Sequence, residues 1–147
     1  MAEATRSEPG GVEALVRLAH VVDRVFTDVA RRHELTPQQA RLLCLLVDGP
    51  VGMGDLGRRL NLEKSSLTGL IDRVERRGLA ARNRDGHDRR ACRIGLTEEG
   101  VRLAHETHGG VTDRLEHLAA ELDPAQRDGL RSAVDRLLAE SEAAEPS

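Results

Sequence analysis

The chain has 147 residues, of which 39% are hydrophobic and 32% charged, and its formal net charge is −3. This composition is too polar for a membrane protein, and no apolar run reaches the roughly 18 residues that a spanning helix needs. The absence of Trp and Tyr argues against a protein that stacks single-stranded bases on aromatic rings. Two cysteines are too few for a disulfide framework or a structural zinc site. Because the first residues lack an apolar export signal, we expect a cytoplasmic protein without a membrane partner.

The small net charge conceals a basic central segment. Residues 58–93 carry eleven basic and five acidic side chains, a net charge of +6, whereas the rest of the chain carries −9. A basic segment between acidic flanks predicts a nucleic-acid-binding module joined to a scaffold that does not touch the nucleic acid. A solvated, arginine-rich surface would give the same charge, so the local structure must decide between these interpretations.

Hydrophobic spacing predicts four helices in the first part of the chain. The first covers about 12–33, and the second begins at Thr36, an N-cap followed by proline, and stops at a Gly-Pro pair. A short third helix covers about 53–60, and after a two-residue turn a fourth runs from about 63 to 77. Gly78 follows as the residue that ends the fourth helix.

A hairpin and two further helices complete the chain. Residues 79–84 and 91–96 form the predicted strands, with Asp85-Gly86 in the turn between them. Thr97 caps a helix whose apolar stripe alternates at spacings of three and four, the pattern of a coiled-coil seam that needs a partner surface. Gly109-Gly110 interrupts the stripe, where the helix can kink. The stripe consists of Val101, Ala104, His108, Val111, Leu115, Leu118 and Leu122.

The last helix begins at Asp123-Pro124, a cap followed by proline. Its residues Leu130, Ala133, Val134, Leu137 and Leu138 recur at helical spacing and are expected to face inward.

The fourth helix and the hairpin together predict a winged helix-turn-helix. Small hydroxyl residues, a glycine and arginines on one face suit a close approach to the major groove, and a basic hairpin tip suits the narrower minor groove. A generic helix pair with surface arginines is the alternative. The face expected to be buried holds Leu67, Leu70, Ile71 and Val74, and the opposite face holds Ser65, Thr68, Gly69, Asp72, Arg73 and Arg76.

Three segments of the chain resemble the MarR family of bacterial transcription regulators. They are LTPQQARLLCLL (35–46), MGDLGRRLNLEKSSLTGLIDRVERRGL (53–79) and RNRDGHDRRACRIGLTEEG (82–100). The last is the most specific, because Asp88, Arg90, Leu96, Thr97 and Gly100 match the family's wing signature. The looser resemblance of the terminal helices extends the match over nearly the whole chain.

The resemblance implies a mainly α (α+β) fold with three parts. Residues 1–11 form a flexible N-terminus, 12–34 and 101–143 a helical dimerisation region of interlocking helices, and 35–100 the winged helix-turn-helix domain. It further implies a homodimeric, sequence-specific DNA-binding regulator on a pseudo-palindromic operator. Such a protein is usually a repressor that a small-molecule ligand releases from DNA.

By the same resemblance, Arg90 enters the minor groove at the wing tip and Asp88 orients it. The remaining DNA-binding residues are Lys64, Ser65, Ser66, Thr68, Gly69, Arg73, Arg84 and Arg89, with His87 as a further tip candidate. Family members often carry a polar or basic side chain where this chain has Gly69, so one base contact is missing. Asp72 would repel phosphate, so we expect it to pair with Arg76 or with a wing arginine.

The expected effector is an organic anion, bound in a crevice between the dimerisation and DNA-binding parts. Its candidate lining residues are His20, Phe26, His33, Arg41 and His108. A zinc- or redox-responsive regulator is an alternative. His105 and His108 do not match a familiar metal-ligand pair, and Cys44 and Cys92 fit small buried apolar positions.

Two other functions are alternatives to a ligand-responsive regulator. An architectural DNA-binding protein would show little sequence preference, and an interaction module that only uses the winged fold would not need the arginine-rich tip DGHDRR. The chain has no phosphate loop, nucleophile motif or metal-ligand cluster, so we predict neither an enzyme nor a cofactor.

Overall fold

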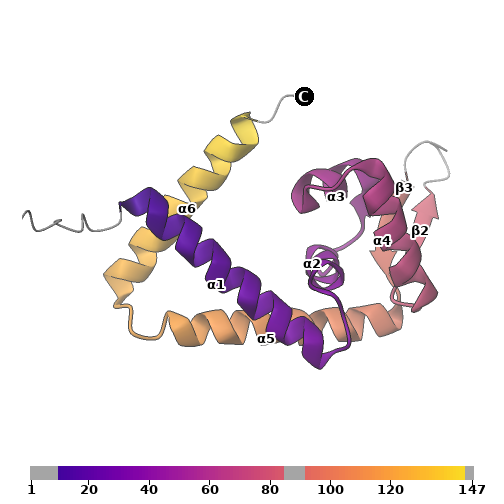
Figure 1. The fold of residues 1–147 in the computed structure, drawn as a ribbon, viewed down its shortest axis with the longest axis horizontal. Coiled ribbons are helices and arrows are strands. Elements are labelled where there is room, and N and C mark those ends of the chain that lie inside the picture. Colours follow the sequence, from indigo (N-terminus) through magenta and orange to yellow (C-terminus); the bar gives the residue numbers. More distant parts are fainter. Residues whose placement is uncertain (1–9, 85–91, 145–147) are drawn as a thin grey trace, which may run out of the picture. The chain divides into compact units, whose positions relative to one another are not determined.

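The computed structural model of the protein describes residues 10–84 and 92–144. In chain order the elements are α1 (Gly11–Arg32), α2 (Pro37–Leu45), β1 (Val51–Gly52), α3 (Met53–Leu60), α4 (Lys64–Arg76), β2 (Ala80–Arg84), β3 (Cys92–Leu96), α5 (Glu98–Leu118) and α6 (Pro124–Ala144) (Figure 1). The chain divides into two structural units, Met1–Asp113 and Arg114–Ser147, and the boundary falls inside α5. This mainly helical fold with a small sheet confirms the predicted fold class.

The sheet of the first unit contains three antiparallel strands in the order β1-β3-β2. Strands β2 and β3 form the predicted hairpin, with Arg82 opposite Ile94 and Arg84 opposite Cys92. The sequence did not reveal β1, in which Val51 pairs with Ile94 on the other side of β3. Two residues, one of them glycine, are too few to show the alternation that identifies a strand.

Local signals in the sequence explain the helix ends. At the start of α2 the Gln39 N–H donates to Thr36 Oγ1 (3.2 Å) and the Thr36 N–H donates to Gln39 Oε1 (3.1 Å), which forms a capping box. The helix ends at Leu45, a few residues before the predicted stop at the Gly-Pro pair. Gly78 has a φ of +72° directly after α4, which confirms its predicted role.

The hydrophobic core of the first unit lies among α2, α3, α4 and the sheet. Complete burial of a leucine or isoleucine contributes about 1.5–3 kcal/mol, so this core holds α4 firmly against the hairpin. Its largest fully buried side chains include Leu42, Leu43, Leu46, Leu56, Leu70, Ile71 and Ile94.

The part of α5 in the first unit buries a different face from the predicted seam. Ala104 and Val111 belong to both, but Val101 and His108 are exposed. The buried face is determined by two close approaches, of Gly100 to the Leu79 backbone and of Gly110 to Val29 of α1. A Cβ on Gly110 would lie 3.1 Å from Val29 Cγ1, so this glycine provides room for α1 within a continuous helix. The buried residues of α5 are Gly100, Leu103, Ala104, Thr107 and Val111.

In the second unit, α6 begins as predicted but buries none of its residues. The Gln126 N–H donates to Asp123 Oδ1 (2.8 Å), and the Asp123 N–H donates to Gln126 Oε1 (3.0 Å). The prediction that the α6 leucines face inward is wrong for the single chain, because Leu130, Leu137 and Leu138 are all about half exposed. Among the described residues, no helix is long and apolar enough to cross a membrane.

Candidate nucleic-acid interface

The turn between α3 and α4 places the two helices at the contact typical of a helix-turn-helix. Asn61 ends α3 in the left-handed conformation (φ +52°), which reverses the chain over two residues. Gly57 lies where a Cβ would come within 3.3 Å of the Leu62 carbonyl oxygen, so its missing side chain allows the tight turn. Leu56 of α3 and Leu67 of α4 are both buried beneath it.

The two faces of α4 differ in burial, and the buried face is the one that the sequence predicted. Leu67, Leu70, Ile71 and Val74 are at most 2% exposed and form the buried face. None of the six DNA-binding residues predicted on this helix is buried. Of these, Lys64, Ser65, Ser66 and Arg73 are exposed, while Thr68 and Gly69 are half-buried.

Polar groups gather at the first turn of α4. Glu63, Lys64, Ser65 and Thr68 line an open hollow there. The Thr68 hydroxyl donates to the Lys64 carbonyl oxygen (2.8 Å), which uses its single donor within the helix. The exposed serine hydroxyls, the ammonium of Lys64 and the helix N–H groups therefore remain as donors toward an anion or a base edge.

Arg82 of β2 joins the hairpin to α4. Its Nη2 donates to Asp72 Oδ1 (2.8 Å), and its Nη1 lies 2.9 Å from Glu75 Oε1. The second contact is not aligned as a hydrogen bond, so its attraction is Coulombic. The hydrogen bond to Asp72 raises the pKa of Arg82 above its ordinary value. The pairing confirms that Asp72 binds a wing arginine, whereas Arg76 reaches only the Asp72 backbone carbonyl (Nε to O, 3.4 Å).

The candidate-residue prediction missed this role of Arg82. Two features of the sequence could have revealed it. Arg82 lies six residues beyond the end of α4, on a strand that runs back along this helix, and the helix carries two acids one turn apart, Asp72 and Glu75. Arg82 offsets part of the negative charge of Asp72 and Glu75, and it thereby reduces the repulsion that these carboxylates would exert on a nearby anion.

The predicted wing tip lies outside the described residues. This concerns His87, Asp88, Arg89 and Arg90, together with the turn at Asp85-Gly86. Arg84 closes the described part of β2, where its backbone pairs with Cys92.

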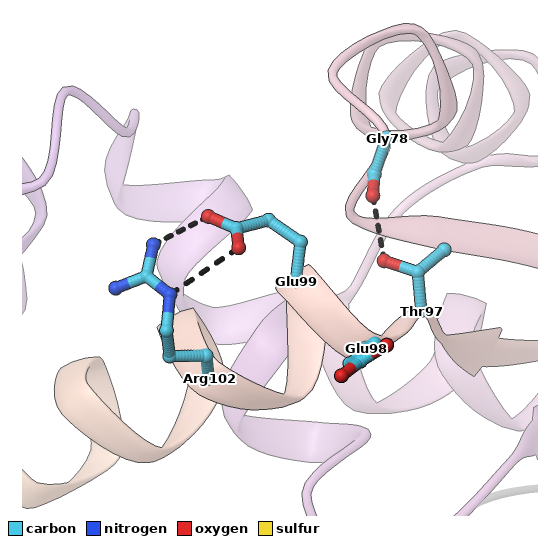
Figure 2. A pocket seen from close by; sticks show the side chains of 5 residues that line it. All are labelled: Gly78, Thr97, Glu98, Glu99 and Arg102. Atoms are coloured by element: carbon cyan, nitrogen blue, oxygen red, sulfur yellow. Dashed lines mark hydrogen bonds and ion pairs between the residues drawn. The ribbon is translucent and has the colours of Figure 1, made fainter.

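The base of the wing is fastened to α5 by Thr97 (Figure 2). The Thr97 hydroxyl donates to the Gly78 carbonyl oxygen (2.6 Å) and accepts from the Gly100 N–H (3.1 Å), so one side chain caps α5 and holds the end of α4. Beside it, Arg102 pairs with Glu99, which lowers the pKa of that carboxyl. The hollow bounded by these residues contains none of the predicted effector contacts.

The structure brings together only two of the five predicted effector residues. The Arg41 guanidinium lies 5.4 Å from the centre of the Phe26 ring and forms an ion pair with Asp23. His33 lies instead beside Glu106 of α5, with 3.7 Å between Nδ1 and Oε2. His20 and His108 are exposed and join neither pair.

Cys44 differs from a redox-active thiol in its setting. Burial raises the pKa of the Cys44 thiol to about 11, so it stays protonated and weakly nucleophilic at neutral pH. Cys92 is a half-buried free thiol on β3. Within residues 10–84 and 92–144, no group of three or more His, Cys, Asp or Glu side chains could hold a metal ion.

Comparison with known proteins matches the chain to transcriptional regulators. A sequence model described as the MarR family matches residues 33–91. The HTH-type transcriptional regulator TtmR of Methylorubrum extorquens is 31% identical over 93% of this chain and 71% of its own length. The homoprotocatechuate degradative operon repressor of Escherichia coli is 28% identical over 86% of each chain. A crystal structure of NadR in complex with 4-hydroxyphenylacetate is 27% identical, with a TM-score of 0.79 over 97% of this chain and 100% of that one.

Proposed function

The chain belongs to the MarR family of transcriptional regulators, and on that basis we propose that it is a homodimeric, sequence-specific repressor that a small-molecule ligand releases from DNA. The observation that carries the DNA-binding part is the exposed face of α4. This face combines Lys64, three hydroxyl residues and Arg73, and Arg82 of the hairpin beside it pairs with the two acids of the same helix. A helix of this kind fits the major groove by its diameter, with the hairpin beside the minor groove.

Exposed apolar side chains support the dimer. Val12 and Val16 of α1 are 79% and 53% exposed, and Leu130, Leu137 and Leu138 of α6 are about half exposed. Apolar stripes on long helices need a covering surface, and a second copy supplies it. We therefore assign residues 12–34 and 101–143 to dimerisation and 35–100 to DNA binding. Two-fold symmetry then requires a pseudo-palindromic operator with half-sites about 34 Å apart.

The proposed effector is an aromatic carboxylate. The pairing of Arg41 with Phe26 supports it. The guanidinium can bind a carboxylate and the Phe26 ring can stack on an aromatic ring, so the pair suits a ligand that carries a carboxylate and an aromatic ring. The ligand in the NadR complex, 4-hydroxyphenylacetate, has this chemistry. The ligand carboxylate would take the position that Asp23 holds beside Arg41.

We expect 4-hydroxyphenylacetate to release the protein from its operator. Arg41→Gln should raise the concentration needed for half release about tenfold or more, since a charge-assisted hydrogen bond contributes roughly 1.5–3 kcal/mol. Arg31→Gln, at the exposed end of α1, is the matched control and should leave that concentration unchanged. Fluorescence anisotropy of labelled operator measures both. Release by zinc alone, with no response to the aromatic acid, would instead support the zinc-responsive alternative.

Replacing Arg90 with alanine is expected to weaken operator binding by about 1–3 kcal/mol while the fold stays intact, because arginine is the preferred occupant of a narrow minor groove. The operator is first recovered by pull-down and sequencing of genomic fragments, and binding is then titrated against random competitor DNA. Circular dichroism checks the fold.

Unchanged affinity of Arg90→Ala would reject the minor-groove role of Arg90. If the unmodified protein binds random competitor as tightly as the recovered fragments, it is an architectural DNA-binding protein and not a specific regulator.

A further inference from the structure

Arg73 of α4 differs from the neighbouring arginines in its contacts among the described residues. Arg76 donates to the Asp72 carbonyl oxygen, and the neighbouring Arg77 donates to the Glu34 carbonyl oxygen (2.8 Å). Within the part of the chain that the structure describes, Arg73 makes no ion pair and no side-chain hydrogen bond. It is exposed on the same face as the serine hydroxyls. Its guanidinium is therefore available to an outside partner.

The position of this guanidinium depends on Gly69, one turn earlier in α4. A Cβ built on Gly69 would lie 3.5 Å from Arg73 Nη1, so the arginine side chain lies back along the helix over the glycine. Long helical side chains point toward the N-terminal turn, which is the part of a recognition helix that meets base edges. Glycine at this position keeps the guanidinium close to the helix axis and leaves the space above it open to DNA.

We propose that Arg73, lying over Gly69, is a specificity-determining residue that reads a guanine in the major groove. This inference rests on the proposed function, because it requires a specific operator. The guanidinium is planar and presents two parallel donors, which match O6 and N7 of guanine. Serine and threonine hydroxyls pair with several bases, and Lys64 is a point charge without a fixed fork.

The geometry also explains how a recognition helix with glycine at position 69 can retain sequence preference. The contact that a side chain at 69 would have made is replaced by a guanidinium that reaches the same place from position 73. A bulky residue at 69 should displace Arg73, whereas alanine should not, because 3.5 Å is an ordinary van der Waals separation.

Selection of bound duplexes from a library with about 20 randomised base pairs tests the proposal. Wild type is compared with Arg73→Lys, Gly69→Leu and Gly69→Ala, and Arg76→Lys is the matched control on the same helix. We expect the wild type to select a guanine at one position of each half-site. Arg73→Lys and Gly69→Leu should lower that preference roughly 5- to 150-fold and keep the rest of the motif. Arg76→Lys should keep the whole motif, and Gly69→Ala should keep the guanine preference that Gly69→Leu loses, because a methyl group fits beside Arg73.

The outcomes separate this inference from the proposed function. If the wild type selects no motif, sequence-specific regulation itself is wrong and the inference fails with it. If the wild type selects a motif that Arg73→Lys also selects unchanged, with a uniform loss of affinity, Arg73 contacts only phosphate and the present inference alone is overturned. Arg73→Lys retains charge and lies on an exposed surface, and circular dichroism confirms that each variant is folded.

Discussion

Gly100→Ala is expected to destabilise the protein by about 3 kcal/mol or more, at the upper end of what overpacking costs. A Cβ on Gly100 would lie well inside contact distance of the Leu79 carbonyl oxygen and 2.8 Å from its carbonyl carbon. That carbonyl cannot move away easily, because it accepts a hydrogen bond from the Thr97 N–H (3.1 Å). The start of α5 would have to shift away from the base of the wing. Urea unfolding followed by circular dichroism, at one protein concentration, measures the loss.

Gly109→Ala in the same helix is the matched control. A Cβ on Gly109 meets nothing within 4 Å. Alanine there should stabilise the helix by about 0.5–1 kcal/mol, because it loses less backbone entropy than glycine on folding. The same substitution at two positions nine residues apart is thus expected to change the free energy of unfolding in opposite directions. Equal stabilities of the two variants would contradict the close packing of α5 on Leu79.

Ile71→Ala is expected to lower the free energy of unfolding by about 2–5 kcal/mol. Ile71 is completely buried and lies in the core that α4 shares with α2 and β3. Removing three carbons leaves a cavity beneath α4, and a packed core relaxes only in part to fill it. DNA binding should then fail at lower denaturant concentrations than in the wild type, in step with unfolding.

Arg76→Ala serves as the control for Ile71→Ala. Arg76 lies on the exposed face of α4, and its side chain reaches only a backbone carbonyl at 3.4 Å. Its removal should change stability by no more than about 0.5 kcal/mol. A comparable loss in both variants would mean that the buried face of α4 is assigned incorrectly.

The helices and the hairpin were predictable because their signals are local. The two-faced pattern of α4, the Thr36 cap and Gly78 each act within a few residues of the chain. Strand β1 could not be found in this way, because its identity depends on pairing with β3 more than forty residues later. The buried face of α5 likewise depends on where Leu79 and Val29 lie in space, which no local spacing records.

The residues of the candidate site also differ in whether local sequence signals could reveal them. Residues on α4 were predictable as a group, since helical periodicity places them on one face. The link from Arg82 to Asp72 and Glu75 joins two elements, and the sequence left open whether Arg76 or a wing arginine would pair with Asp72. The effector residues needed contacts between α1 and its neighbours. Of the five predicted, the structure pairs only Phe26 with Arg41, and it adds Asp23 and Glu106 as partners that periodicity could not show.

The ion pairs of Arg82 also bear on how DNA affinity should vary with salt. Basic residues that neutralise phosphates release condensed counterions, and the slope of log affinity against log salt counts them. Arg82 forms ion pairs with two carboxylates of α4, so we expect it to add nothing to the number of released counterions. On this helix, Lys64, Arg73 and Arg76 are the basic residues that can add to the count where they meet phosphate. The basic segment thus contributes fewer released ions than its eleven positive charges suggest.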